Sequence, residues 1–320
     1  MSCGTLVWEK SPVQSRLRNH HVTLVASTKA GAFLYAIGGA NLDVTLNNVD
    51  RAPIGADGAL GAWSAGPALP VPVGGLAGGL VGNVVVVAGG MTMQGTTDKS
   101  WSAVVGDDGS LGSWKQGGSV AHPRMHPGAF VKDSALYVVG GFDAASVWDD
   151  VVRSDVSPDG SLSDWRPAGK LPSPRSHFGL TYVDGAVYLS GGLDQSANGS
   201  PPPLADVSLG RIGEDGSLGD WTPMPKLPVA LCTHASFVYG GYLYVVGGLS
   251  GAAYKHERRA WRAPIQSDHS LGAWQSVAPL PTARAHVHHL PIFADRVYSV
   301  GGALDGQLNS TDEIAIGAFR

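Results

Sequence analysis

The sequence predicts an all-β protein, a six-bladed β-propeller of four-stranded antiparallel blades. Two recurring marks carry this prediction along the 320-residue chain: six apolar runs end in a glycine pair, and a tryptophan precedes each pair at a nearly constant distance. Short strands at even spacing, with glycine and aromatic marks once per unit, are typical of propellers. No segment shows a sustained helical period.

The marks define six repeats. The first glycines of successive pairs lie 51, 51, 51, 56 and 54 residues apart. The pairs are Gly38-Gly39, Gly89-Gly90, Gly140-Gly141, Gly191-Gly192, Gly247-Gly248 and Gly301-Gly302, and the tryptophans are Trp8, Trp63, Trp114, Trp165, Trp221 and Trp274.

One repeat illustrates the four strands, which we name a to d. Pro172 and Pro174 favour an extended entry into strand a, and Asp184-Gly185 predicts a two-residue hairpin turn between strands a and b. Strand b ends at the glycine pair. Strand c precedes a second Asp-Gly turn, and strand d carries the tryptophan. Apolar residues alternate along strands a and b, at Leu180, Tyr182, Val187 and Leu189.

The two chain ends hold parts of one repeat. The chain begins with a strand d, residues 6–10, and stops after a strand c, residues 313–319. Joining them completes a sixth unit, so residues near 5–10 are expected to pair beside residues near 310–319. This closes a single propeller over 1–320 through the N-terminal strand in the last blade and removes two exposed edges.

At this level the repeats resemble the kelch repeat over the whole chain. The resemblance rests on the glycine pair, on the tryptophan about two dozen residues after it, and on an aromatic residue before the pair: Tyr35, Tyr137, Tyr188, Tyr244 and Tyr298. It implies a kelch-like propeller. Such propellers serve as enzymes, lectins and interaction scaffolds, so the resemblance leaves the function open.

Composition removes several function classes. Charged residues make up 15% and the net charge is −4, so no basic surface suggests nucleic acid. The apolar runs are too short to span a bilayer. The sequence contains no phosphate-binding loop, so no nucleotide cofactor is expected. The N-terminus carries no secretory signal, and Cys3 and Cys232 are interpreted as free thiols. Both observations favour a cytoplasmic location.

The start of strand a carries the candidate site. Arg-x-His occurs there in repeats one, three, four and six, and both residues are absent from repeats two and five, which lie opposite each other in a ring of six. Residues two apart on a strand share a side. The channel mouth is therefore expected to hold four arginines, Arg18, Arg124, Arg175 and Arg284, with four imidazoles about 7 Å deeper, His20, His126, His177 and His286.

Neutral imidazoles suit copper or iron. The main hypothesis is a metal-dependent enzyme: the four histidines bind a transition metal, and the four arginines draw in an anionic or carbonyl-bearing small molecule. No catalytic residue or reaction is assigned. Two other interpretations stay open, an anion or polar-ligand pocket and plain blade packing. In the packing case the arginines bond to b–c loop carbonyls or to Asp43, Asp143, Asp194 and Asp305.

A further alternative is a non-catalytic binding module, a lectin or a protein-interaction scaffold that uses the same face, so protein and glycan partners remain open. His21 and the pair His288-His289 extend the histidine count at two blades. Because a strand alternates its faces, adjacent histidines are not expected to point inward together.

Overall fold

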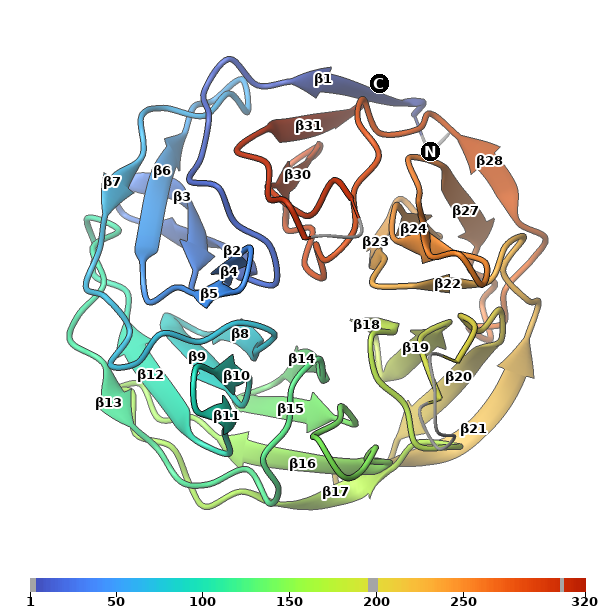
Figure 1. The fold of residues 1–320 in the computed structure, drawn as a ribbon, viewed down its shortest axis with the longest axis horizontal. Helices are drawn as coiled ribbons and strands as arrows, with labels where there is room; N and C mark the ends of the chain where they lie inside the picture. The colour runs from blue at the N-terminus through green and yellow to red at the C-terminus, as the bar shows by residue number, and fades with distance from the viewer. Residues whose placement is uncertain (1–3, 195–200, 306–307) are drawn as a thin grey trace.

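The computed structural model describes residues 4–194, 201–305 and 308–320. Its strands form six four-stranded antiparallel units around a central axis (Figure 1). Four units are separate sheets. The other two are joined into an eight-stranded sheet by a single parallel pairing, Gly169 with Leu218. The described residues contain no helix, hence none that could cross a membrane. The predicted fold class is confirmed.

Each unit is one blade, and its strands are named here in order from the central axis outward. Blade 1 contains β2 (Val22–Thr28), β3 (Gly31–Ile37), β6 (Val49–Ile54) and β7 (Ser64–Ala65). Blade 2 contains β8 (Ala77–Val81), β9 (Val84–Ala88), β12 (Ser100–Val104) and β13 (Lys115–Gln116). Blade 3 contains β14 (Gly128–Lys132), β15 (Ala135–Val139), β16 (Asp150–Asp155) and β17 (Arg166–Lys170).

The second half repeats this order. Blade 4 contains β18 (Gly179–Val183), β19 (Ala186–Ser190), β20 (Val207–Ile212) and β21 (Leu218–Met224). Blade 5 contains β23 (Ala235–Tyr239), β24 (Tyr242–Val246), β27 (Ala260–Pro264) and β28 (Gln275–Val277). Blade 6 contains β29 (Ile292–Phe293), β30 (Arg296–Val300), β31 (Ile314–Phe319) and β1 (Leu6–Lys10).

Short strands also form in the b–c connections, on one face of the ring. Blade 1 has the hairpin β4–β5 and blade 2 has β10–β11, while the connection of blade 5 adds a three-stranded sheet with the segment that precedes β23. These strands are β4 (Ala40–Asn41), β5 (Val44–Thr45), β10 (Met91–Thr92), β11 (Gly95–Thr96), β22 (Leu231–Cys232), β25 (Leu249–Ser250) and β26 (Lys255–His256).

The second strand of each blade forms its core. Every residue of β9, β15 and β19 is buried, because both faces of these strands pack against neighbouring blades. The a–b turn that leads into β19 is a two-residue hairpin in which Asp184 (φ 48°) and Gly185 (φ 82°) are both left-handed, as predicted.

The glycine pairs are required where one blade meets the next. At Gly39 the backbone has φ +103°, and a Cβ atom would lie 2.5 Å from the carbonyl oxygen of Asn19. The Gly39 N–H donates to the carbonyl of Val73 in blade 2 at 2.8 Å, and equivalent bonds link every blade to the next, including Gly302 to Arg18. The absence of a side chain therefore allows the blades to approach this closely.

The repeated aromatic residues join neighbouring blades. The indole of Trp114 donates to the carbonyl of Pro67 at 2.9 Å, and Trp8, Trp221 and Trp274 make equivalent bonds to the preceding blade. The hydroxyl of Tyr35 donates to the carbonyl of Gly109 in the Asp-Gly turn of blade 2 at 2.6 Å. The tryptophans thus lie in structural positions between blades, as expected from their fixed spacing.

The ring closes as predicted. Strand β1 pairs with β31 over five positions, from Leu6 opposite Phe319 to Lys10 opposite Ala315. Figure 1 shows the dark blue β1 beside the dark red β31. The last blade is therefore built from both ends of the chain.

Candidate functional site

The four arginines do not line the channel mouth. Each guanidinium is buried inside its own blade, where it donates to the carbonyl of the first glycine of the pair and to a carboxylate at strand c. Arg124 lies 2.9 Å from the Gly140 oxygen and 2.8 and 2.7 Å from the two carboxylate oxygens of Asp150. The equivalent ion pairs are Arg18–Asp50, Arg175–Asp206 and Arg284–Glu313.

This ion pair explains why the arginine is present in only four blades. In blade 2, Val73 replaces the arginine and Lys99 stands at the position of the acid. In blade 5, Leu231 and Arg259 stand at the two positions. Cation and acid are therefore lost together. The prediction that arginines face a substrate was wrong in its geometry, because the segment that carries them is not an extended strand.

The acids suggested for the packing alternative were also the wrong ones. Asp143 and Asp305 accept hydrogen bonds within their own b–c loops. The acids that hold the arginines follow the glycine pair by 10 to 15 residues in the four Arg-x-His repeats, as Asp50, Asp150, Asp206 and Glu313. The backbone register shows the position, because the carbonyls of Asp150, Asp206 and Glu313 accept from the first glycine of their pair, as those of Lys99 and Arg259 do in blades 2 and 5. In blade 1 the acid, Asp50, lies two residues after the equivalent Asn48.

The histidine positions form a closed backbone ring around the channel. At each of the six equivalent positions the N–H donates to the carbonyl of the preceding one, over distances of 2.7 to 3.3 Å, and His20 donates to His286 to complete the circle. All six residues are left-handed: His20, Gly75, His126, His177, Thr233 and His286. Left-handed backbone favours glycine, so histidine at four of these positions accepts local strain, a feature that clusters at functional sites.

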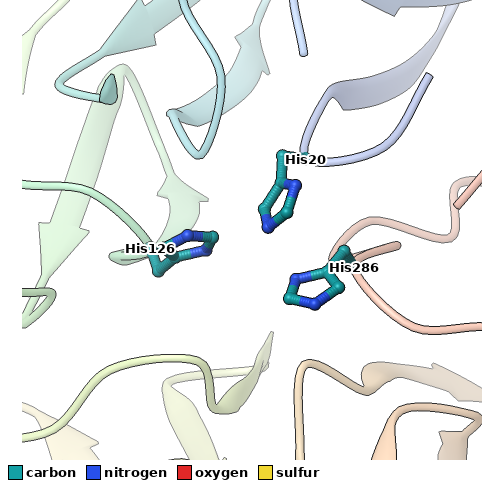
Figure 2. A group of neighbouring side chains, drawn as sticks. All are labelled: His20, His126 and His286. Carbon is teal, nitrogen blue, oxygen red and sulfur yellow. The ribbon is translucent and has the colours of Figure 1, made fainter. Parts of the chain in front are cut away.

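Three of the predicted imidazoles converge. Side-chain nitrogens of His20, His126 and His286 all lie within 4.8 Å of one another, and Figure 2 shows the three rings turned toward a common point from three separate segments. Their ring centroids are 4.7 Å apart for His20 and His126, 4.0 Å for His20 and His286, and 6.1 Å for His126 and His286.

These imidazoles are neutral. Burial lowers the pKa of His20 to about 3. Burial also lowers the pKa of His126 and His286 well below the usual value, and the neighbouring imidazoles lower it further. The tautomer of His20 is set by Asn19: the amide nitrogen donates to the carbonyl of Leu308 at 3.0 Å, so its oxygen accepts the Nδ1 proton and leaves the Nε2 lone pair free.

His177 lies beside this group but not in it. Its ring stacks on His126, with centroids 3.9 Å apart and planes inclined by 20°, and its Nδ1 pairs with the Ser176 hydroxyl at 2.8 Å. The expected rectangle of four imidazoles is replaced by three convergent rings and one stacked ring.

His288, a histidine outside the predicted set of four, lies next to these imidazoles. The centroid of His288 lies 5.5 Å from that of His126, and 6.2 Å from those of His20 and His286. The alternation rule did not predict this, because residues 287–291 belong to no strand and β29 is only two residues long.

Two cavities flank the imidazoles. The upper one, about 230 Å³, opens among the b–c connections; His20 and His126 line it together with Leu42, Met91 and Met125, and Asp43 is the single acid in its lining. The lower one, about 260 Å³, is lined by residues of β2, β8, β18 and β23 and by His288.

The b–c face carries an apolar patch. Among the described residues, every large apolar side chain with high exposure lies on a b–c connection or on the segment from β1 to β2, over the consecutive blades 6, 1 and 2. These residues are Leu17, Leu42, Val44, Met91, Met93 and Leu304, with Met93 63% exposed and Val44 57% exposed. We call this set the apolar patch. Figure 1 shows the hairpins β4–β5 and β10–β11, which carry four of them, on neighbouring blades.

The cysteine offers no nucleophile. Cys232 is a buried free thiol, and burial raises its pKa to about 12, so the reactive thiolate is suppressed. Cys3 lies outside the described residues.

Comparison with known proteins gives relatives that match part of the ring. No family model matches the chain. Beta-scruin of Limulus polyphemus is 26% identical over 246 residues, 74% of this chain and 25% of that protein. Kelch-like protein 33 of Homo sapiens is 33% identical over 127 residues, 39% of this chain and 22% of that protein. The chain thus spans about a quarter of the length of these curated relatives.

A solved structure, described as "Structure of YjhT", superposes with a TM-score of 0.73 over 95% of both chains at 13% identity. At that identity the likeness shows the fold alone. Fold and blade architecture define a closed β-propeller with one glycine pair per blade. The curated relatives, scruins and Kelch-like proteins, support its assignment to the kelch-repeat family at low sequence identity.

Proposed function

We propose that this propeller is a non-catalytic binding module that takes a protein partner on its b–c face, over blades 6, 1 and 2. The observation that carries the proposal is the apolar patch, which gathers the large exposed apolar side chains of the described residues on one face. Leu42 and Met91 line one cavity between blades 1 and 2, and exposed apolar surface gathered in this way marks interaction sites. Kelch-repeat relatives at low identity are consistent with a scaffold role.

The chemistry of the patch favours a protein over a glycan. It consists of leucine, valine and methionine, whereas sugar recognition relies on aromatic surface with amide and acid groups beside it. Flexible thioethers such as Met91 and Met93 adapt to apolar side chains of a partner. The pocket of about 230 Å³ beside them has room for one large apolar side chain. We place this partner in the cytoplasm, where a free thiol such as Cys232 stays reduced.

The test is position-specific photocrosslinking in native cell extract. A photoreactive amino acid at Met93 should attach one defined protein, identified by mass spectrometry. The same amino acid at exposed Asn83, in the a–b turn of the same blade on the opposite face, is the matched control. Val44→Asp should abolish the product while leaving the melting temperature unchanged, because the Val44 side chain is exposed.

Equal labelling from both faces, or a Met93 product that survives Val44→Asp, would overturn the protein-binding proposal. A glycan array with the same protein examines the lectin alternative: specific sugar binding that is lost on Val44→Asp would also overturn it.

A second candidate function rests on the convergence of His20, His126 and His286. We infer that these imidazoles bind a transition metal, copper or iron, beneath the upper cavity, which then takes a small molecule. A metal-dependent reaction of that molecule is the enzymatic form of this candidate. Metal content after reconstitution, in protein purified without a histidine tag, tests it: His126→Ala should lose the metal, and wild type without metal refutes it.

A further inference from the structure

We propose that His288, not His177, is the fourth ligand of this metal site, and that the resulting four-imidazole site prefers Cu(I). The inference rests on the metal candidate above and goes beyond it, because it replaces one predicted ligand, adds a residue outside the predicted set and selects an oxidation state.

The ring separations lie near those that one shared ion requires. Binding would widen the 4.0 Å separation of His20 and His286 and draw His288 inward, because its nitrogens lie outside the group that falls within 4.8 Å. Metal–nitrogen bonds of about 2 Å hold the centroids of two ligating imidazoles roughly 5–6 Å apart in tetrahedral geometry. His288 stands 5.5 Å from His126 and 6.2 Å from both His20 and His286. Its ring planes are inclined by 42° to 76° to the other three, so the rings approach from different directions.

His177 does not fit the same ion. A ring lying flat on His126 at 3.9 Å directs its nitrogens alongside those of its neighbour rather than toward the centre of the group. We therefore leave His177 outside the ligand set.

Buried nitrogens without partners point to a missing ligand. Nδ1 of His126, Nδ1 of His286 and Nε2 of His288 are buried and have no hydrogen-bond partner among the described residues. The side chain of His286 is only 8% exposed. A buried polar atom left unpaired costs free energy, so these three nitrogens on neighbouring rings require an explanation. A bound metal ion supplies it.

His20 is prepared for the same role. Its Nδ1 proton is accepted by Asn19, whose amide is itself fixed by Leu308 and by the hydroxyl of Ser310 at 3.0 Å. Metal-ligating histidines commonly donate their second nitrogen to such an acceptor, which sets the tautomer and aims the free lone pair.

The charge of the site selects the oxidation state. In the described residues the convergent group consists of imidazoles alone, and an imidazole must be neutral to bind a metal. Because the cost of burying an ion grows with the square of its charge, an all-neutral buried site favours a monovalent ion. The thioethers Met91 and Met125 line the cavity above the imidazoles, and thioethers also suit Cu(I).

His288 also links the two ends of the channel. It lines the lower cavity, whereas His20 and His126 line the upper one. The histidine group therefore contributes to the linings of both cavities.

The test uses the full chain without a histidine tag. Protein is loaded anaerobically with Cu(I), and X-ray absorption on the wild type counts the nitrogen ligands directly, without any variant. We expect one copper with four nitrogens. His288→Ala should give three nitrogens and at least a tenfold weaker affinity in chelator competition. His177→Ala, the matched control, should keep four. Apoprotein melting curves show that each variant is folded.

The outcomes distinguish a failure of the metal candidate from a failure of the His288 assignment. Wild type that takes up no copper overturns both the metal candidate and this inference. Copper bound with three nitrogens in the wild type refutes the role of His288 and leaves the three-histidine candidate standing. The same conclusion follows if His288→Ala binds copper as the wild type does while His126→Ala loses it. Loss of one nitrogen in His177→Ala refutes the assignment of the fourth ligand. Tighter binding of Cu(II) or Zn(II) than of Cu(I) refutes the charge argument.

Discussion

The buried pair of Arg124 and Asp150 offers the sharpest test of how the blades are built. Replacing Arg124 with valine reproduces the residue that blade 2 has at this position. The change removes a fully buried guanidinium and leaves the Gly140 carbonyl and the Asp150 carboxylate without their donor.

The magnitude follows from the contacts. Removing one partner of a buried ion pair costs about 3–5 kcal/mol. The side chain of Asp150 keeps 23% exposure, so water replaces part of the lost interaction and the lower end applies. We expect Arg124→Val to lower the free energy of unfolding by about 3 kcal/mol.

A double-mutant cycle separates pairing from packing. Asp150→Lys alone places a cation beside buried Arg124 and should destabilise the protein. Combined with Arg124→Val it recreates the valine and lysine of blade 2. The double variant should therefore be more stable than the sum of the single effects implies, by about 1–3 kcal/mol. Urea unfolding followed by tryptophan fluorescence measures this.

Strict additivity in that cycle would refute the explanation of why arginine and acid vary together. Copper binding provides the second readout. Arg124 lies inside the blade, so Arg124→Val should bind Cu(I) as wild type does. A loss of copper in this variant would show that Arg124 contributes to the metal site.

The other predictions concern closure, blade packing and acid sensitivity. Deleting residues 4–10 exposes the edge of β31, so the protein should melt at a lower temperature and self-associate in sedimentation; an unchanged monomer would contradict the closure. Trp165→Ala should cost about 3 kcal/mol in urea unfolding, since the indole is half-buried and donates to the Ser100 hydroxyl at 3.2 Å; no loss would make the tryptophan dispensable. Burial lowers the pKa of His234 to about 3. The contribution of His234 to the free energy of unfolding is therefore constant above about pH 6.5 and falls as pH decreases below it. Its share at pH 5 is about 2 kcal/mol, and His234→Gln should remove that share from the pH dependence of unfolding.

The sequence contained enough to predict the ring, because every blade repeats the same steric requirement. The glycine pairs, the Asp-Gly turns and the spaced tryptophans each correspond to one contact between neighbouring blades, and six copies make chance agreement negligible. The split repeat at the termini predicted the pairing of β1 with β31. These features depend on local backbone conformation and spacing, which a sequence displays directly.

The site was less predictable, for a local reason. The segment with Arg-x-His was taken as an extended strand, which would place both side chains on one side. Its histidine is left-handed instead, and that turn sends the arginine into the blade and the imidazole into the channel. His288 was missed for the converse reason: its segment lacks the strand alternation that the prediction assumed. Single φ angles decide both cases, and no periodicity reports them.

The circle of backbone hydrogen bonds has an electrostatic consequence. Six N–H groups and six carbonyls follow one another head to tail around the axis in one rotational sense, from His20 through Thr233 to His286. Their dipoles lie along the circumference, so they cancel in pairs across the channel and leave little net field along it. Each of these carbonyl oxygens accepts an N–H from the next position and so points along the ring rather than into the channel, unlike the carbonyls of a selectivity filter. At this level of the channel, selectivity among ions is therefore left to the side chains alone.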